Sequence, residues 1–330
     1  MKYKLIQSLK ALTAGGLIAL GSLVATPACA ESLKLGHITP PSHVWHKVGE
    51  HIASNLAEAS GGKMKITVSP LQKLGNEGQM INLMQAGAVQ FGIFTAAGLA
   101  NREESFLGWS LPYTFRDVEH ASHAASTPAA REMLKRLEPN GLVGLGYTFA
   151  GMRHVLSLEP VKSPKDLANK KIRAFPSPIY NDWWAANGAA PTAMPLSEVA
   201  PSLTTKLLDA VDIDLDALVG LKFHQQAPYL TLTNHMAFPG VIVVSKKWWD
   251  SRSDADRAMI TKAVAEAEAW GFQEAIAADK ANLVTAKADG AKVVDADLSS
   301  FEAVGKQIRD KYTAKNPLIA DFYKQASALK

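Results

Sequence analysis

The sequence predicts an α/β fold divided into two lobes, with mainly parallel sheets flanked by helices. Three observations lead to this fold class. Apolar segments of strand length alternate with amphipathic segments of helical length over residues 33–149, an order typical of parallel sheets covered by helices. The chain has 330 residues, a length that favours two lobes over one. A proline-free, alanine-rich stretch over 254–288 predicts a helix roughly 50 Å long at about 1.5 Å per residue, longer than one lobe.

The N-terminal segment has the pattern of a cleaved secretory signal peptide over residues 1–30. Lys2, Lys4 and Lys10 lead an apolar run that ends at Cys29-Ala30, which gives a positive n-region, an apolar h-region and a small-residue cleavage site. An uncleaved anchor and a lipoprotein processed at the cysteine are the alternatives. Cleavage would lower the formal charge from +4 to about +1 and would leave no disulfide chemistry and no other candidate membrane span.

The first half of the chain predicts strands over 33–38, 64–69, 89–94 and 142–149, and helices over 43–59, 77–86 and 121–137. The first helix shows the reason, since apolar residues recur every four positions from Val44 to Leu56 and Gly61-Gly62 ends it. Ligands of such sheets bind beyond the carboxyl ends of the strands. The residues at those ends are His37, Ile38, Thr39, Asn76, Glu77, Phe94, Thr95 and Ala96.

A short apolar strand over 172–175 carries Arg173 and is followed by a helix with Trp183 and Trp184. Ser197 is predicted to be the N-cap of a further helix, because its side-chain oxygen can accept a free amide of the first turn. An arginine where a strand meets a helix is a typical anion-binding group of an α/β protein. The alternative is an arginine on an exposed strand face.

Toward the C-terminus, the sequence predicts a buried strand over 240–245 and the long helix over 254–288, capped by Ser253 and ended by Gly290. A helix of that length must cross between lobes or be broken, and Gly271 is the candidate bend. A coiled coil is not expected, because the apolar positions do not follow a heptad.

Other function classes lack their signatures. The chain has no polybasic tract, which argues against a nucleic-acid partner, and no nucleophile elbow, phosphate-binding loop or zinc-protease motif. The histidine pairs His43/His46 and His120/His123 are each three residues apart on predicted helices. We expect them to face solvent, because no third ligand lies at a metal-site spacing.

Three aspartates, Asp212, Asp214 and Asp216, alternate with apolar residues and are called the aspartate cluster below. In an extended segment they would all point to one face. Such an arrangement is costly unless water or a cation compensates the charges. We expect a solvated strand end, with a metal or a cationic substrate as the alternative.

Several segments together carry a family resemblance: KIRAFPSPIYNDWWAANGAAPTAMPLSEV, KLLDAVDID, KFHQQAPYLTLTNH, LQKLGNEGQMINLMQAGAVQFGI, LANREESFLGWSLPYTFRDVEHA and YTFAGMRHVLS. With them the chain resembles the solute-binding proteins of tripartite ATP-independent periplasmic (TRAP) transporters, of the dicarboxylate-binding-protein (DctP) type, over almost all of its length. The resemblance implies a non-enzymatic periplasmic protein with the two-lobed periplasmic binding protein fold. One long helix would run across both lobes, which would close around a ligand.

The resemblance also implies site residues. Arg173 matches the carboxylate-binding arginine of the family, whose planar guanidinium can hold a carboxylate by two parallel hydrogen bonds. Arg153 matches a second arginine that contacts ligand in some members, and a surface ion pair with Glu159 is the alternative. Ile213 stands where the family has a ligand-contacting asparagine, and Asp214 stands where it has a proline.

This departure predicts a ligand with an apolar or aromatic body, or an amine or polyol contact from Asp214. Phe175, Leu196 and the two tryptophans would line such a body. Trp183 and Trp184 are adjacent on a helix, so they cannot both face the ligand, and we expect at least one of them to pack in the core.

We therefore expect a binding protein that captures a small organic anion by hinge closure and delivers it to the membrane subunits of a TRAP transporter. The expected lobes are residues 31–150 with 239–278, and residues 151–238 with 279–330.

Two other functions stay open: a periplasmic metal-dependent hydrolase that uses the aspartate cluster, and a sensor subunit that reports to a membrane receptor. No cofactor is expected, although a divalent or sodium ion beside the ligand is left open. After cleavage of the signal peptide, we expect no direct membrane insertion. The sequence does not choose among monocarboxylates, dicarboxylates, sugar acids, aromatic acids and sulfonates.

Overall fold

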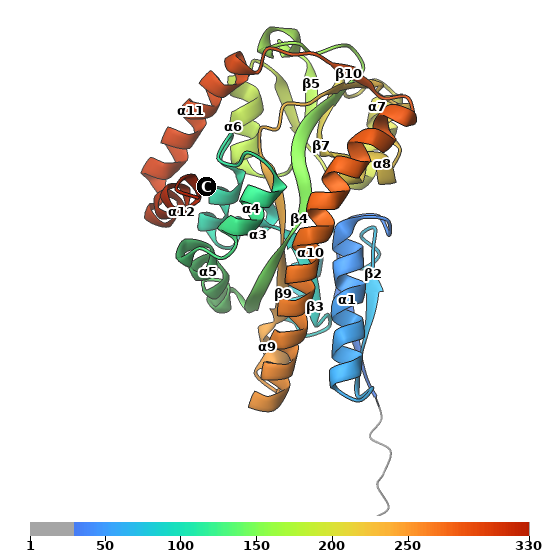
Figure 1. Cartoon of the computed structure of the whole chain (residues 1–330), viewed down its shortest axis with the longest axis vertical. Helices are drawn as coiled ribbons and strands as arrows, with labels where there is room; N and C mark the ends of the chain where they lie inside the picture. Colours follow the sequence, from blue (N-terminus) through green and yellow to red (C-terminus); the bar gives the residue numbers. More distant parts are fainter. Residues whose placement is uncertain (1–29, 330) are drawn as a thin grey trace, which may run out of the picture.

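The computed structural model describes residues 30–329, so the predicted signal peptide, apart from Ala30, lies outside the described residues. Figure 1 shows an elongated molecule in which one long helix runs beside the central strands toward both ends. Within residues 30–329, no helix is long and apolar enough to cross a membrane.

The strands are β1 (Glu31–Gly36), β2 (Met64–Ser69), β3 (Phe91–Thr95), β4 (Leu142–Ser157), β5 (Lys171–Ala174), β6 (Ala190–Ala193), β7 (Ala210–Asp214), β8 (Tyr229–Thr231), β9 (Ala237–Ser245) and β10 (Lys292–Val294). The α-helices are α1 (Val44–Ala59), α2 (Glu77–Gln85), α3 (Ala96–Leu99), α4 (Val118–Ala124), α5 (Pro128–Lys135), α6 (Pro178–Ala186), α7 (Val199–Thr204), α8 (Leu215–Gly220), α9 (Lys246–Trp249), α10 (Asp254–Ala288), α11 (Leu298–Lys315) and α12 (Pro317–Ser327). Short 3₁₀ helices are η1 (Glu104–Ser110), η2 (Glu138–Asn140), η3 (Pro164–Leu167), η4 (Leu196–Glu198) and η5 (Phe223–Gln225).

The sheet has the order β2-β1-β3-β9-β4-β7-β5-β6, with β8 and β10 joined to it through β4. Its outer parts are parallel, as the alternation of strands and helices predicts: β1 pairs with β2 and β3, and β5 pairs with β6 and β7. The central strands are antiparallel, because β9 and β4 run in opposite directions through the middle of the molecule. The sheet is therefore mixed, with parallel pairing confined to the outer strands and to the pair β8–β10.

The sequence predicted that this strand ends at Phe149, but β4 continues to Ser157. Its first part pairs with β9, and from Arg153 onward it pairs with β7. Between the two parts the register shifts, and Gly151 adopts φ +135°, which a glycine tolerates best. The single strand β4 thus connects the two halves of the sheet.

The long helix α10 is unbroken over Asp254–Ala288 and contacts α1 and α4 as well as β4 and α8. The expectation of one helix that spans both lobes is confirmed. Gly271 is not a break in it: a Cβ there would lie 2.6 Å from Cγ2 of Val48. The glycine therefore allows α10 to pack closely against α1.

Two helix boundaries differ from the prediction. The expected helix over 121–137 is two helices, because Pro128 begins α5 and Thr127 caps it by accepting the N–H of Ala130. Ser197 is not an N-cap, because it lies inside the 3₁₀ turn η4 and α7 begins only at Val199.

Trp183 and Trp184 are both fully buried in the hydrophobic core, which agrees with the expectation that at least one of them packs there. Helix α6 has cover on two sides: it contacts β5 and β6 of the sheet and also α11. The two rings meet the same histidine, His235, with Trp183 stacked on it and Trp184 edge-on. Adjacent tryptophans can both be buried because a helix between two layers has no solvent face there.

Candidate functional site

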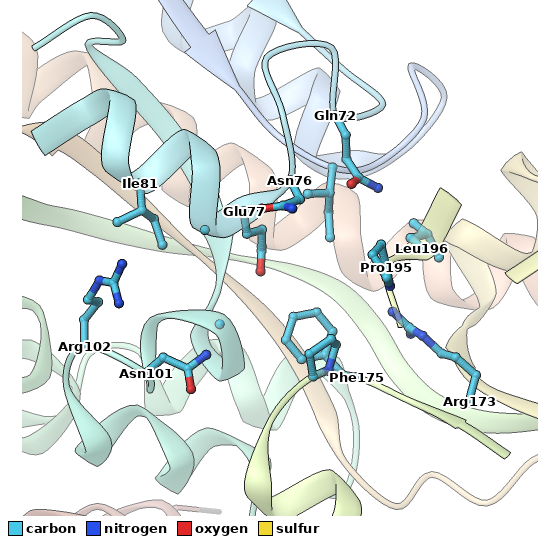
Figure 2. A pocket seen from close by; sticks show the side chains of 14 residues that line it. Gln72, Asn76, Glu77, Ile81, Asn101, Arg102, Arg173, Phe175, Pro195 and Leu196 are labelled. Carbon is cyan, nitrogen blue, oxygen red and sulfur yellow. The ribbon is translucent and has the colours of Figure 1, made fainter. Parts of the chain in front are cut away.

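A cavity of about 270 Å³ lies between segments that come from the two halves of the sheet. Its lining residues are Ile38, Gln72, Asn76, Glu77, Gly78, Ile81, Gly98, Asn101, Arg102, Arg173, Phe175, Pro176, Pro195 and Leu196. Figure 2 shows the start of α2 and the segment after α3 on one side, and the ends of β5 and β6 on the other. The cavity thus lies at the carboxyl ends of strands, where ligands of such sheets bind.

Half of the predicted site residues line this cavity: Asn76, Glu77, Arg173, Phe175 and Leu196. The other five do not: His37, Thr95, Arg153, Ile213 and Asp214. The tryptophans of α6 do not line it either. The prediction did not name Gln72, Asn101, Arg102 or Pro195 as site residues, although all four lie in segments that carry the family resemblance.

Arg173 is a buried cation without an acidic partner. Its side chain is 2% exposed, and no carboxylate among the described residues forms an ion pair with it. Its Nε donates to the carbonyl oxygen of Met194 at 3.1 Å, and its guanidinium lies 5.7 Å from the ring centre of Phe175. Burial, together with the charge of Arg153, lowers the pKa of Arg173 to about 10, so the group stays charged at neutral pH. Its terminal nitrogens are suited to a carboxylate that enters the cavity.

Glu77 begins α2, directly after Asn76, which caps this helix in a capping box with Gln79. The Glu77 carboxylate accepts hydrogen bonds from the Thr95 backbone N–H at 2.6 Å and from the Thr95 hydroxyl at 2.8 Å. Burial raises the pKa of Glu77 to about 7, although these bonds and Arg173 oppose the rise. Thr95 therefore positions the Glu77 carboxylate through two hydrogen bonds. With a pKa of about 7, Glu77 is close to the midpoint of its titration at neutral pH.

Arg153 has the opposite environment to Arg173. It is 1% exposed, and its guanidinium pairs with the carboxylates of Asp212 and Asp214. It also donates to the carbonyl oxygen of Asp212 and lies 4.1 Å from the ring centre of Phe238. The alternative pairing with Glu159 is wrong, because the strand β7 beside β4 supplies the carboxylates.

The family model for the bacterial extracellular solute-binding proteins, family 7 (DctP), matches residues 35–316. The chain belongs to this family. Its members are solute-binding transport proteins rather than enzymes, and the resemblance stated from the sequence is confirmed.

Three similar proteins illustrate the relationship. The 2,3-diketo-L-gulonate-binding periplasmic protein YiaO of Escherichia coli (strain K12) is 29% identical over 311 residues, which cover 92% of this chain and 94% of that protein. A TRAP periplasmic solute-binding protein from Bradyrhizobium sp. BTAi1, solved in complex with α/β-D-galacturonate, is 29% identical with a TM-score of 0.84 and covers 90% of this chain and 99% of its own. A TRAP periplasmic solute-binding protein from Pseudomonas putida F1, solved with bound D-glucuronate, is 25% identical with a TM-score of 0.86. The match covers 91% of this chain and 98% of that protein's chain.

In this DctP-family protein, the aspartate cluster is a buried structural network and not a solvated strand end. Strand β7 ends at Asp214, so Asp216 lies in the first turn of α8. Asp212 accepts from the Trp184 indole N–H at 2.9 Å, and Asp214 caps α8 by accepting the N–H of Ala217 at 2.8 Å. Burial alone would raise the pKa of Asp212, but Arg153 and His235 outweigh it and hold the pKa below its usual value.

The hydrolase alternative loses its basis, because these carboxylates already have partners in the protein. In the part of the chain that the structure describes, no three His, Cys, Asp or Glu residues are grouped to hold a metal ion. Ile213 faces the other side of β7 from Asp212 and Asp214, as alternation along a strand requires. It packs there in a separate hydrophobic cluster with Val211 and does not reach the cavity.

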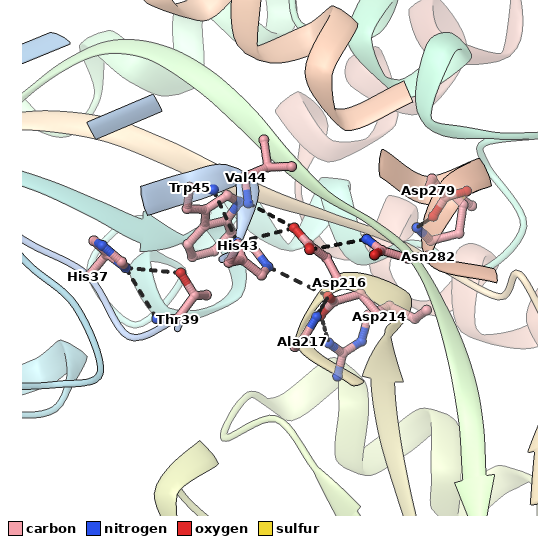
Figure 3. Close-up of polar contacts among 12 residues, drawn as sticks. His37, Thr39, His43, Val44, Trp45, Asp214, Asp216, Ala217, Asp279 and Asn282 are labelled. Carbon is pink, nitrogen blue, oxygen red and sulfur yellow. Dashed lines mark hydrogen bonds and ion pairs between the residues drawn. The ribbon is translucent and has the colours of Figure 1, made fainter. Parts of the chain in front are cut away.

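The prediction of solvent-facing histidines is wrong for His43 and His120, both of which are buried. His43 caps α1 by accepting the N–H of Trp45 at 3.1 Å, and its Nε2 lies 3.6 Å from Oδ1 of Asp214 (Figure 3). His120 Nε2 lies 3.0 Å from the carbonyl oxygen of Ala326, so α12 covers it. These histidines hold elements together and do not form a metal site with their pair partners.

His37 is also buried. It was predicted to contact the ligand directly, but it does not line the cavity. Its ring contacts Thr39 at 2.9 Å and His46 at 3.0 Å. Burial, with the neighbouring His46 and His43, lowers the pKa of His37 to about 3, so the ring is neutral at physiological pH. His37 orders the chain that leads from β1 to Ile38, which does line the cavity.

Proposed function

We propose that this protein captures a small sugar acid in the cavity, with Arg173 as the carboxylate anchor, and delivers it to the membrane subunits of a TRAP transporter. The observation that carries the proposal is the buried, unpaired guanidinium of Arg173 at the cavity wall. A buried charge without a partner is costly, and an anionic ligand removes that cost by forming charge-assisted hydrogen bonds.

The rest of the lining supports a hydroxylated acid. Gln72, Asn76, Glu77 and Asn101 supply donors and acceptors, while Phe175 offers an apolar face beside Arg173. The volume of about 270 Å³ lies just below the range of about 300–1,000 Å³ for small-molecule sites, which suits a ligand of six or so carbons. Relatives solved with galacturonate and glucuronate agree with this class.

The mechanism we propose is closure of two lobes, made of residues 31–150 with 239–278 and residues 151–238 with 279–330. Asn76, Glu77 and Arg102 belong to the first lobe and Arg173 and Leu196 to the second, so a ligand that touches both sets favours the closed form. The central strands β4 and β9 and the helix α10 pass between the lobes and serve as the hinge.

Membership of the family supports a proposal for the location and the membrane partner. We propose secretion to the periplasm through cleavage after Ala30 and docking on the integral membrane subunits of a TRAP transporter. Retention of residues 1–30 in the mature protein, measured by mass spectrometry of the protein exported by its host, would contradict the cleavage.

The test of ligand class is a calorimetric titration of the mature protein with D-galacturonate, D-glucuronate and L-gulonate, with D-galactose as the uncharged counterpart. We expect the acids to bind and the neutral sugar not to bind. At a hundred times its dissociation constant, a ligand also stabilises the fold by about 2.7 kcal/mol, which a melting curve detects.

The matched variants are Arg173→Gln and Arg136→Gln, since Arg136 is exposed at the end of α5 and away from the cavity. Arg173→Gln should weaken acid binding by about a hundredfold or more, because two charge-assisted hydrogen bonds are lost. Arg136→Gln should leave it unchanged. An Arg173→Gln protein that melts like the wild type and binds the acids as tightly would overturn the proposed function.

A further inference from the structure

A second guanidinium lies at the opposite end of the cavity from Arg173. Figure 2 shows Arg102 and Asn101 on one side, Arg173 and Leu196 on the other, and Glu77 between them. The two arginines come from different halves of the sheet, because Arg102 follows α3 and Arg173 lies on β5. A ligand that fills the cavity therefore has one cation at each end.

The Arg102 side chain is held in place but not neutralised. Its Nη2 donates to the side-chain oxygen of Asn82 on α2 at 3.2 Å, and its backbone N–H donates to the carbonyl oxygen of Leu99 at 2.8 Å. No carboxylate within residues 30–329 lies within ion-pair distance of Arg102. Asn101, its neighbour, adds a side-chain amide to the same end of the lining.

The charges that line the cavity favour a doubly charged ligand. Glu77, Arg102 and Arg173 are the only charged members of the described lining. Glu77 already accepts two hydrogen bonds from Thr95, and burial raises its pKa to about 7. When Glu77 carries a proton, two cations face the ligand, and a dianion balances both of them.

We propose that Arg102 and Asn101 form a second anion subsite, so that the cavity prefers an acid with a carboxylate at each end, such as an aldarate, over the aldonate of the same configuration, whose far end is a neutral CH2OH. This inference rests on the proposed function, because it takes Arg173 as the anchor of the first carboxylate. The far end of the ligand then decides selectivity, and the residue that sets it is Arg102.

The two subsites differ in strength. Arg173 is buried, whereas Arg102 and Asn101 are exposed at the rim. An exposed ion pair contributes little and is screened by salt. Arg102 should therefore set a preference of about twofold to fivefold, and that preference should shrink as the ionic strength rises.

The experiment is a calorimetric titration of the mature protein with D-galactonate and with galactarate at low and at high ionic strength. Both acids are open chains, and they differ only in that one end is a neutral CH2OH in galactonate and a carboxylate in galactarate. We expect the wild type to bind galactarate about twofold to fivefold more tightly at low salt. Arg102→Gln should abolish the preference by weakening galactarate alone, and Arg102→Lys should retain part of it. The control Arg136→Gln should behave as the wild type.

Equal affinity of the wild type for the two acids would overturn the second subsite while leaving the proposed function intact. The same holds if Arg102→Gln weakens both acids equally. If neither acid binds the wild type, this inference is overturned, and if the acids titrated under the proposed function also fail to bind, the proposed function falls with it. Arg102 is exposed, so the variant is expected to fold, and its melting temperature without ligand is the check.

Discussion

Asp216 accepts a hydrogen bond at 2.8 Å from the backbone N–H of Val44, which lies 172 positions away in the chain. The other Asp216 oxygen accepts from the Asn282 side chain at 3.1 Å (Figure 3). One carboxylate thus ties the first turn of α1 to α8 and to the long helix α10. The contact between Asp216 and Val44 joins the two proposed lobes, and neither residue lines the ligand cavity.

Asp216→Ala should lower the free energy of unfolding by about 1–3 kcal/mol, because a buried N–H at the start of α1 loses its acceptor. Urea unfolding measures the change. Asp250→Ala, which removes an exposed pair with Lys246, is the control and should cost less than about 1 kcal/mol. Equal effects of the two substitutions would show that the Val44 contact contributes nothing to stability.

Arg153 is expected to act mainly on stability. Arg153→Met leaves the carboxylates of Asp212 and Asp214 buried without their cation, which should cost about 3–5 kcal/mol in the free energy of unfolding. The double variant Arg153→Met/Asp212→Asn should recover part of this loss, because one of the two unpaired charges is gone. If Arg153→Met unfolds like the wild type and instead loses ligand affinity, Arg153 is a ligand contact.

The sequence predicted the site residues that local features reveal, and it missed those that depend on contacts between distant segments. Arg173 was identifiable, because a strand-to-helix junction is a local feature, and Glu77 followed from the strand-end rule. Arg102 was not, because it reaches the cavity only when the segment after α3 packs beside α2. The Arg153–Asp212 pair joins antiparallel strands 59 positions apart, and no local pattern predicts which strands become neighbours.

One wrong helix boundary could have been recognised from the sequence. Thr127-Pro128 is a helix start inside the stretch that was predicted to be one helix. The antiparallel centre of the sheet had no such signal, because the direction of β9 beside β4 depends on the path of the chain through β5 to β8, which lie between them in the sequence. Burial of both Trp183 and Trp184 depended likewise on α11, more than a hundred positions later.

Gly271→Ala tests the close packing of α10 against α1. A Cβ at this position would lie 2.6 Å from Cγ2 of Val48, so overpacking should cost about 1–3 kcal/mol against a gain in helix propensity of about 1 kcal/mol. Val48→Ala provides room for the new methyl group. In a double-mutant cycle of urea unfolding, the two substitutions should therefore couple favourably. Strict additivity would show that the contact tolerates the methyl group.

Glu77 should make stability fall as the pH rises toward neutrality. Its pKa is raised from 4.5 to about 7 by burial, so between these values the folded state holds a proton that the unfolded state has released. Stability from this group is fully present below about pH 4.5 and is lost as the pH passes through about 7.

The variant Glu77→Gln isolates this contribution, because it keeps the shape and removes the titration. Relative to the wild type, its free energy of unfolding should rise by about 1–2 kcal/mol between pH 5 and 8, a discounted figure because the side chain is only half-buried at the cavity. Urea unfolding of both proteins across that range measures the difference in slope, which does not depend on the constant loss of a Thr95 hydrogen bond. Parallel pH profiles would mean that Glu77 is ionised throughout, and two cations would then face one fixed carboxylate in the cavity.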